Sequence, residues 1–484
     1  MDSRVEGGGT RIFQNAVAFL GGEFFYRFIN FFSCIFIARS LGGESYGQFS
    51  FIYVYLSFFE IFVQFGLNAV LTRELSHGPE NAPRILGNAL ILRILLILVS
   101  LPVAFALIRQ PGYPITVQQG VLLASLQLFL TLRPIFETIF RVQLSMLQPA
   151  IWNGVRALSN LLLVVLVTFY RPGLYLFILS YFVSGVVSLA GLGMSSRKRM
   201  PFDFRLDKNL MIRLIRESFP LMLSGYLTVL YYRVDVLMLS WMKTFREVGY
   251  YSVATRLTES LNMVSGALLV SFFPLFARFF KESRSEFESL FSNAFKWLSL
   301  AGLPLVIGGV LVARDLILLF FGPEYAPSAA TFTVLLGYTF FCFIGSLLAN
   351  VLIACGKQAA DMWISFFLAL FNIGLNIMLI PTYSYNGSAV ATVFTEVMGV
   401  GIYFWYAIKN SQIRLFFPKR ESWDALKINL IFLVTLLFIR WALKLPVIAF
   451  ILVGILVYAG LLLVFRMISW STVKNYALQR AKTS

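Results

Sequence analysis

Residues 197–216 read RKRMPFDFRLDKNLMIRLIR, the longest polar stretch of a chain that otherwise consists largely of apolar runs. Six apolar runs, each long enough to cross a membrane, precede this basic stretch, and at least six follow it. We therefore interpret it as a linker between two halves built from transmembrane helices. An orientation signal that also touches anionic lipid is favoured here over a regulatory site.

The composition agrees with a membrane protein. Of the 484 residues 58% are hydrophobic and 13% are charged, whereas globular chains are typically about 45–50% apolar and about 25% charged. Large soluble domains are therefore excluded. The formal net charge of +17 indicates cytoplasmic loops rather than a nucleic-acid partner. His77 is the only histidine and the three cysteines lie in apolar runs, so we expect no metal cluster and no disulfide framework.

We predict an all-α polytopic membrane protein with about fourteen transmembrane helices. The apolar runs begin near residues 12, 46, 85, 116, 150, 173, 214, 248, 293, 327, 361, 386, 426 and 446. With the N-terminus in the cytoplasm, about 25 of the 40 Lys and Arg residues fall on the cytoplasmic side and about seven fall outside. This asymmetry supports the count and predicts that both chain ends are cytoplasmic.

A faint internal repeat favours two six-helix halves. Phe25-Tyr26-Arg27 followed by Tyr46-Gly47 resembles Tyr231-Tyr232-Arg233 followed by Val248-Gly249. Halves that are separated by an even number of spans have parallel topology and handle substrate between them. We predict an N-terminal lobe over 1–196, a basic cytoplasmic linker over 197–213, a C-terminal lobe over 214–408, and a final helix pair with a cytoplasmic tail over 409–484.

Charged residues within the predicted spans are costly and are expected to face a cavity or a partner. Glu23 and Arg27 lie four residues apart, as do Arg133 and Glu137, so each pair shares one helical face. The basic residues within spans are Arg27, Arg93, Arg133, Arg156, Arg233, Arg256, Lys296 and Arg440, and the acidic ones are Glu23, Glu60, Glu137, Asp235, Glu259 and Glu396. Either the polar stripes converge on an interior, or pairs such as Glu23 with Arg27 and Arg256 with Glu259 only neutralise one another.

Arg233 and Asp235 are two residues apart and point about 200° away from each other on a helix. One division is that Arg233 faces an anionic substrate while Asp235 faces into its own half. Ion pairs to other helices are the alternative for both residues.

The richest polar run contains Asn372 and Asn376 on one face, then Ser388 and Thr392 on another. Oxygen atoms from Asn and Thr, with the charge of Asp235, suit a dehydrated small cation, and they predict a Na⁺ or H⁺ coupling site. Hydrogen bonding between packed helices explains the same spacing.

These motifs resemble a known superfamily. Ala38-Arg39-Ser40-Leu41-Gly42, Tyr46-Gly47-Gln48-Phe49 and Arg73-Glu74 are similar to the opening of Wzx-type polysaccharide flippases of the multidrug/oligosaccharidyl-lipid/polysaccharide exporter superfamily. The later landmarks are Asp235, Gly249-Tyr250-Tyr251-Ser252, Asn376, Pro381, Gly387 and Thr392. The resemblance covers about residues 10–408.

The resemblance implies two six-helix lobes in a V around a central cavity, with a C-terminal helix pair. It also implies an inner-membrane, alternating-access flippase that moves a polyprenyl-pyrophosphate-linked oligosaccharide outward, driven by Na⁺ or H⁺. The predicted substrate-binding residues are Arg27, Arg233, Arg256, Arg133, Glu23 and Glu60, and the predicted coupling residues are Asp235, Asn372, Asn376 and Thr392. Asn376 stands where relatives can carry a second carboxylate. The expected partners are the lipid-linked glycan, membrane lipid and a polysaccharide polymerase, with no cofactor beyond the coupling ion and no metal other than Na⁺.

The sequence also bears on three alternative functions. A lipid II flippase and a cation-coupled multidrug exporter belong to the same superfamily, and a drug exporter should have an acidic cavity. A membrane enzyme usually carries a large extracytoplasmic loop, whereas the longest predicted outer loop here covers only 314–326. We therefore expect a transporter and not an enzyme.

Overall fold

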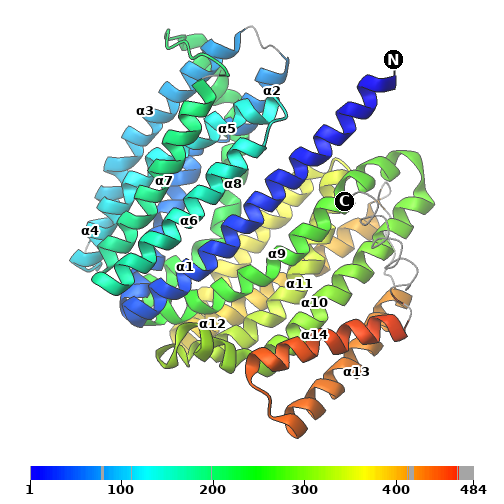
Figure 1. The fold of residues 1–484 in the computed structure, drawn as a ribbon. Coiled ribbons are helices and arrows are strands. Elements are labelled where there is room, and N and C mark those ends of the chain that lie inside the picture. The colour runs from blue at the N-terminus through cyan, green and yellow to red at the C-terminus, as the bar shows by residue number, and fades with distance from the viewer. Residues whose placement is uncertain are drawn as a thin grey trace. The chain divides into compact units, whose positions relative to one another are not determined.

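The computed structural model describes residues 2–77, 81–110, 112–197, 199–410, 413, 419–465 and 467, and all elements of these residues are helices (Figure 1). Twelve of the described helical segments are long and apolar enough to cross a membrane. Two of these segments contain a bend, at Gly42 (φ 71°, ψ 173°) and at Ser384 (φ 51°, ψ −135°). Because each bend separates two limbs of spanning length, the predicted count of about fourteen spans agrees with the structure.

The chain divides into two compact units that meet between Ser252 and Val253. The first contains α1 (Asp2–Gln64), α2 (Leu67–His77), α3 (Ala82–Ile108), α4 (Ile115–Ala124), the 3₁₀ helix η2 (Ser125–Leu132), α5 (Arg133–Val142), α6 (Leu147–Tyr170), α7 (Leu174–Arg197) and α8 (Lys208–Met242). The second contains most of α9 (Phe245–Glu282), then α10 (Arg284–Phe321), η3 (Pro323–Tyr325), α11 (Ser328–Ala354), α12 (Gln358–Lys409), α13 (Lys419–Leu443) and α14 (Val447–Val464). The predicted lobe and linker boundaries stay a prediction.

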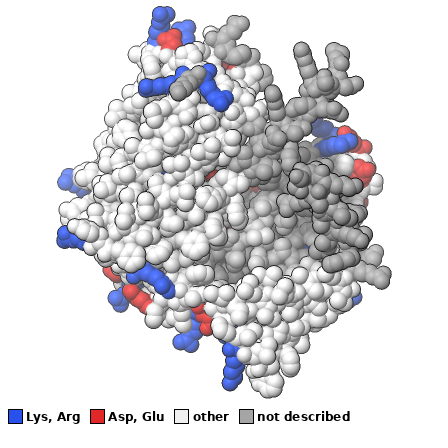
Figure 2. Space-filling model, in the orientation of Figure 1, with Lys and Arg blue, Asp and Glu red and all other residues white. Residues whose placement is uncertain are grey.

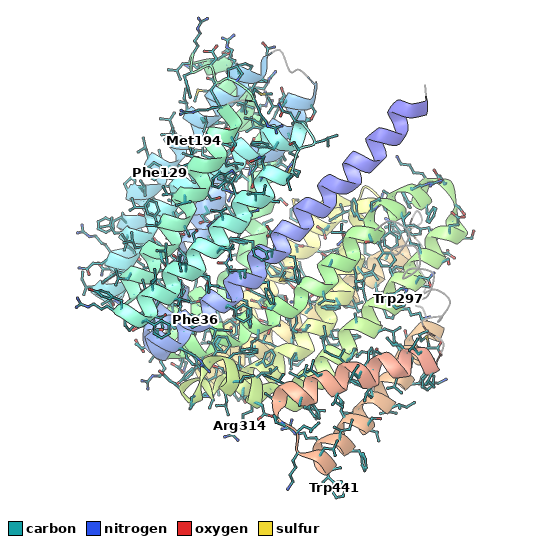
Figure 3. All side chains as sticks on the ribbon, in the orientation of Figure 1. Phe36, Phe129, Met194, Trp297, Arg314 and Trp441 are labelled. Carbon is teal, nitrogen blue, oxygen red and sulfur yellow. The ribbon has the colours of Figure 1, made fainter. Side chains whose placement is uncertain are left out.

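In the first unit α1 packs on α6 and α8, α6 packs on α7, and α2 packs on α5. On its visible face, over α3, α6 and α7, uncharged residues form a broad area, and charged residues gather at the ends (Figure 2). Met194 of α7, labelled in Figure 3, is 62% exposed on the surface. An apolar exposed band between charged ends is what a lipid-facing surface requires.

The segment before α8 is docked against the start of α3. Buried Asn88 donates to the Arg205 carbonyl at 3.0 Å and accepts from the Asp207 amide at 2.9 Å. A Cβ atom on Gly87 would lie 1.8 Å from the Asp203 carbonyl oxygen, so this close backbone approach requires glycine. The segment that we interpret from the sequence as a linker is therefore attached to the first unit through backbone groups of residues 203–207.

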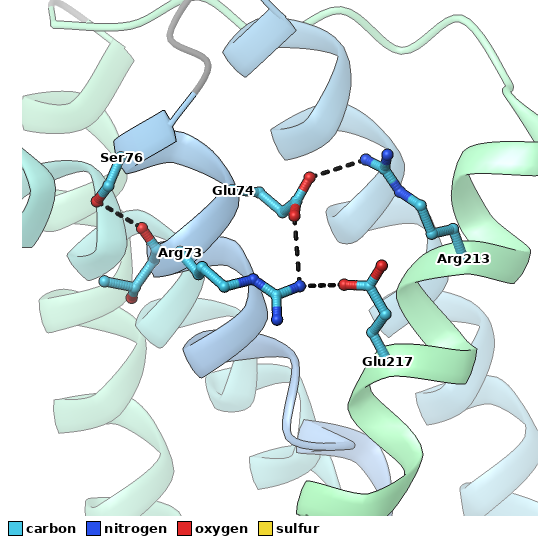
Figure 4. A network of polar contacts seen from close by, with 6 residues as sticks. Arg73, Glu74, Ser76, Arg213 and Glu217 are labelled. Atoms are coloured by element: carbon cyan, nitrogen blue, oxygen red, sulfur yellow. Dashed lines mark hydrogen bonds and ion pairs between the residues drawn. The ribbon is translucent and has the colours of Figure 1, made fainter.

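An ion-pair network ties α8 to α2 nearby (Figure 4). Glu74 accepts from Arg213 at 2.8 Å and from Arg73 at 3.4 Å, and Arg73 also pairs with Glu217. Below it, an apolar core of residues from α2, α3, α5 and α8 includes Leu71 and Leu214, both fully buried. Charge pairing at the end and apolar packing below it fix the direction in which α8 enters the unit.

The two repeated motifs, Tyr46-Gly47 and Val248-Gly249, contact each other within the first unit, and the glycine of each lies against the backbone of the other stretch. A Cβ atom on Gly47 would lie 1.7 Å from the Phe245 carbonyl oxygen, and one on Gly249 would lie 2.1 Å from the Gly43 carbonyl oxygen. Gly43 lies four residues before Gly47, and Phe245 lies four residues before Gly249. The two stretches therefore make equivalent contacts with each other and cross with local two-fold symmetry. We call this contact the glycine crossing.

In the second unit α11 packs on α10 and α12, and α13 packs on α10 and α14. Phe432, Leu436 and Phe450 are buried in an apolar cluster with Val312 of α10. The predicted final helix pair is thus present as α13 and α14, and it covers α10.

Candidate functional site

A seam of polar side chains runs along α1 and α6. On α1, Arg27 Nε lies 2.9 Å from Glu23 Oε1, and the two side chains are 56% and 36% exposed. On α6, the Arg156 guanidinium lies over the Tyr26 ring at 5.4 Å, and Asn160 Nδ2 donates to Asn30 Oδ1 at 3.3 Å. The α1–α6 seam consists of Glu23, Tyr26, Arg27, Asn30, Arg156 and Asn160.

Glu60, on the second limb of α1, interacts electrostatically with Arg156 and with Tyr53. Gln127 Nε2 donates to the Tyr53 hydroxyl at 2.6 Å, and the Tyr53 and Tyr181 ring centroids are 5.5 Å apart. The structure thus brings predicted Glu23, Arg27 and Glu60 into one region with aromatic and amide groups.

The seam also contains an unsatisfied group. Asn160 Oδ1 is buried and has no hydrogen-bond partner among the described residues. Buried polar atoms are nearly always paired with protein or ordered water, so this acceptor is suited to a water molecule or a ligand hydroxyl.

The sequence places Arg156 within a predicted span but does not indicate that it belongs to the substrate-binding residues. The four-residue spacing of Arg156 and Asn160 on one face of α6 was the available signal. Tyr53, Gln127 and Tyr181 carried no such signal, because aromatic residues are common throughout the chain.

Arg133 has different surroundings. Its side chain is 10% exposed, and it pairs with Glu137 at 2.8 Å. Arg133 Nε donates to Ser188 Oγ at 3.1 Å, and Nη2 donates to the Pro149 carbonyl at 3.4 Å. Arg133 therefore connects α5 to α6 and α7, and its predicted substrate role stays a prediction.

Asp235 is buried in the first unit and accepts a hydrogen bond from the Tyr251 hydroxyl of α9. It also accepts from the Val236 amide at 2.9 Å, and it interacts electrostatically with Arg233. Arg233 is half-buried. The charges of the two residues interact, and the expectation that their side chains are turned away from each other stays a prediction.

The predicted coupling residues of the second unit form a buried hydrogen-bond network across the two limbs of α12. Asn376 Nδ2 donates to Asn372 Oδ1 at 2.8 Å, Ser388 Oγ donates to Asn376 Oδ1 at 2.7 Å, and Asn372 Nδ2 donates to Thr395 Oγ1 at 3.2 Å. Thr392 instead donates to the Ser388 carbonyl at 3.0 Å. Thr395, which the sequence analysis does not name, joins the network through Asn372, and the predicted coupling role of Thr392 stays a prediction. We call Asn372, Asn376, Ser388 and Thr395 the α12 network.

The α12 network is uncharged, and both of its amide oxygens already accept hydrogen bonds. This arrangement matches the alternative of hydrogen bonding between packed helices. Asp235 belongs to the first unit, so a joint site with these residues stays a prediction. Among the described residues no group of three His, Cys, Asp or Glu side chains is placed to hold a metal ion.

Arg256 and Glu259 pair at 3.2 Å on α9 of the second unit, with side chains 45% and 39% exposed. They repeat on α9 the exposed ion pair that Glu23 and Arg27 form on α1. Exposed pairs of the same kind, Arg278 with Glu282 and Arg284 with Glu288, lie at the end of α9 and at the start of α10.

Comparison with protein families decides the identity of the chain. The profile of the family described as polysaccharide biosynthesis protein matches residues 12–280, more than half of the chain. The chain belongs to this family. The profile described as lipid II flippase MurJ matches residues 213–461. The protein is thus a polysaccharide flippase of the multidrug/oligosaccharidyl-lipid/polysaccharide exporter superfamily, as its sequence motifs predicted.

Curated relatives and solved structures agree. The chain is 23% identical over 390 residues to the probable low-salt glycan biosynthesis flippase Agl15 of Haloferax volcanii, with 78% of this chain and 79% of the relative covered. It is 22% identical to the succinoglycan biosynthesis transport protein ExoT of Rhizobium meliloti, over 60% of this chain and 58% of the relative. The fold is similar to lipid II flippase MurJ in an inward closed conformation, with a TM-score of 0.78, 17% identity and coverage of 92% and 98%.

Proposed function

We propose that this flippase moves a polyprenyl-pyrophosphate-linked oligosaccharide from the inner to the outer leaflet by alternating access, driven by a cation gradient. The family and the flippase relatives support a lipid-linked glycan as the cargo. The membrane would be the cytoplasmic one, with both chain ends in the cytoplasm, and a polysaccharide polymerase would use the exported unit.

The observation that carries the proposal is the exposure of Arg27. A charged side chain within a span is costly in lipid and is expected to face water or a partner. Arg27 is paired with Glu23 and is still 56% exposed. Arg156 lies over the ring of Tyr26, the residue before Arg27 in the sequence, and the unsatisfied Asn160 oxygen lies one turn from Arg156 on α6. A wet path along the α1–α6 seam accounts for all of these groups, and its guanidinium groups suit a pyrophosphate.

The sugar portion would meet the amide and aromatic groups beside the seam. Gln127 and Tyr53 present hydrogen-bonding groups, and the Tyr181 ring packs against the Tyr53 ring in a tilted orientation. Amides and hydroxyls can bond sugar hydroxyls in either direction, whereas the polyprenyl tail can stay in lipid.

Coupling would act at Asp235. It is the buried carboxylate that the Tyr251 hydroxyl holds, and a carboxylate can take up either H⁺ or, with added oxygen ligands, Na⁺. We expect Asp235→Asn to abolish the dependence of transfer on the driving gradient. Retained dependence on both Na⁺ and pH in this variant would remove Asp235 from the coupling step.

The test of the function is reconstitution in liposomes with a defined polyprenyl-pyrophosphate oligosaccharide and with lipid II, under imposed Na⁺ or pH gradients. Lipid II is the second substrate to test, because the MurJ profile covers 213–461. A cationic drug is the third arm, for the multidrug-exporter alternative. Transfer of the oligosaccharide and not of the drug is the expected result, and gradient-driven drug transfer alone would contradict the proposal.

A further inference from the structure

A cavity of about 220 Å³ lies in the second unit, away from the residues assigned above. It lies between α10, α13 and α14, and it is lined by Val312, Asp315, Arg440, Lys444, Leu445, Val447 and Phe450. Its volume is several times the roughly 30 Å³ share of one water molecule in the liquid. The cavity is therefore large enough for a small polar group.

The charges of the cavity favour an anion. Arg440 pairs with Asp315 at 3.2 Å and also donates to the Leu311 carbonyl, so these contacts fix its guanidinium. Lys444 adds a second cation that is exposed at the cavity wall. Two cations face one carboxylate, which leaves an excess of positive charge.

The start of α14 adds to this excess. Pro446 precedes the helix without a side-chain cap, and Val447, its first residue, lines the cavity. The first amide groups of a helix lack intrahelical partners and carry partial positive charge, which favours a phosphate. The cations and the helix end are independent features that point to the same ligand chemistry.

The surroundings of the cavity are those of a membrane interface. Trp441 and Leu443 are 77% and 58% exposed at the end of α13, and Ile448 is 59% exposed on α14. Figure 3 shows Trp441 near the end of α13, and Arg314, the neighbour of Asp315, on α10. Exposed Trp beside cations at the end of an apolar span is typical of the headgroup level of a bilayer.

We infer that this cavity binds the phosphate of an anionic phospholipid. The phosphate lies between Arg440, Lys444 and the first turn of α14, and the acyl chains run along the exposed apolar residues beside it. This site goes beyond the transport function and does not depend on it.

The test is native mass spectrometry of the full purified chain with phosphatidylglycerol or phosphatidylcholine of identical acyl chains. We expect preferential retention of phosphatidylglycerol, and a loss of about three- to fivefold in its occupancy for Lys444→Gln. Asp315→Asn, which removes the only acidic group lining the cavity, should raise the occupancy. Arg109→Gln is the matched control, since Arg109 is an exposed cation on an aromatic ring at a predicted outer helix end but lines no part of the cavity.

Equal phosphatidylglycerol occupancy in the wild type, Lys444→Gln and Asp315→Asn would overturn the inference. Added inorganic phosphate separates the two sources of the anion, with the Tm of the wild type and of Lys444→Gln as the measurement. Phosphatidylglycerol should raise the wild-type Tm where phosphate alone does not. An equal rise with phosphate alone would show a soluble anion as the ligand and would overturn the lipid assignment.

Discussion

Arg27 and Arg93 both lie on helices that are apolar enough to cross a membrane, yet the first unit surrounds them in opposite ways. Arg27 is 56% exposed and meets a carboxylate four residues away on its own helix. Arg93 is fully buried and donates to the Thr131 carbonyl at 2.7 Å, the Gln64 carbonyl at 3.0 Å and Asn68 Oδ1 at 3.1 Å.

The difference separates two uses of the same side chain. Arg93 supplies donors to carbonyl oxygens where α1 ends and where η2 replaces α-helical bonding, so its charge stabilises irregular backbone inside a span. In the part of the chain that the structure describes, Arg27 bonds to the Glu23 carboxylate and to no backbone carbonyl, and its side chain is exposed to a ligand. Exposure and bonding partners, more than the presence of charge, distinguish a candidate binding residue from a structural one.

The largest effect should come from Arg93→Leu. It leaves one buried and two partly buried hydrogen bonds without their donor, and we expect a loss of about 3–5 kcal/mol of folding free energy. The measurement is the yield of monodisperse protein and its Tm in detergent. Arg109→Leu, at the residue that follows α3, should leave both unchanged. An unchanged Tm for Arg93→Leu would contradict the structural role.

Arg27→Ala should have the next largest effect, and it should act on transport alone. Loss of a charge-assisted contact worth about 1.5–3 kcal/mol lowers the transfer rate by about ten- to 150-fold. The measurement is oligosaccharide transfer in liposomes at matched protein amounts, with Tm as the control for folding. A normal transfer rate in this variant would remove Arg27 from the substrate path.

Asn376→Leu tests whether the α12 network has a structural role, as Arg93 has, or a role in transport, as we propose for Arg27. The change removes the donor to Asn372 and the acceptor of Ser388, and we expect a loss of about 0.6–2 kcal/mol in stability. Transfer per folded molecule should be unchanged, as for a structural contact. A changed Na⁺ or pH dependence would instead assign Asn376 to coupling.

Glu23→Gln should have the smallest effect. An exposed ion pair is worth about 0.2–1 kcal/mol, so transfer should stay within about fivefold of the wild type. Tm and liposome transfer are measured together. A loss as large as that of Arg27→Ala would show that the pair acts as a unit.

Fold class and span number followed from the sequence, because the length and hydropathy of each apolar run decide whether it can cross a bilayer. The starts predicted near 46 and 386 lie beside the bends at Gly42 and Ser384, where one residue with non-helical φ and ψ joins two helical limbs directly. Two runs joined by a tight bend and two separate helices have the same composition, so only the backbone distinguishes them.

The candidate site was less predictable. Arg27 and Arg93 gave the same signal, an arginine within an apolar run, and their roles differ only through neighbours distant in the sequence. Asn88 and Gly87 gave none, since their function is to hold the backbone of 203–207, more than a hundred residues away. Hydropathy carries no information on such contacts.

The glycine crossing limits how far the two halves of the chain can diverge. Gly47 and Gly249 each face a carbonyl of the opposite stretch, so a methyl group added at either position separates the same pair of backbones. Once one of the two glycines is replaced and the backbones have separated, a methyl group at the other glycine would no longer clash. We therefore expect the two replacements together to cost less than the sum of their separate costs, because the two glycines serve the same backbone approach.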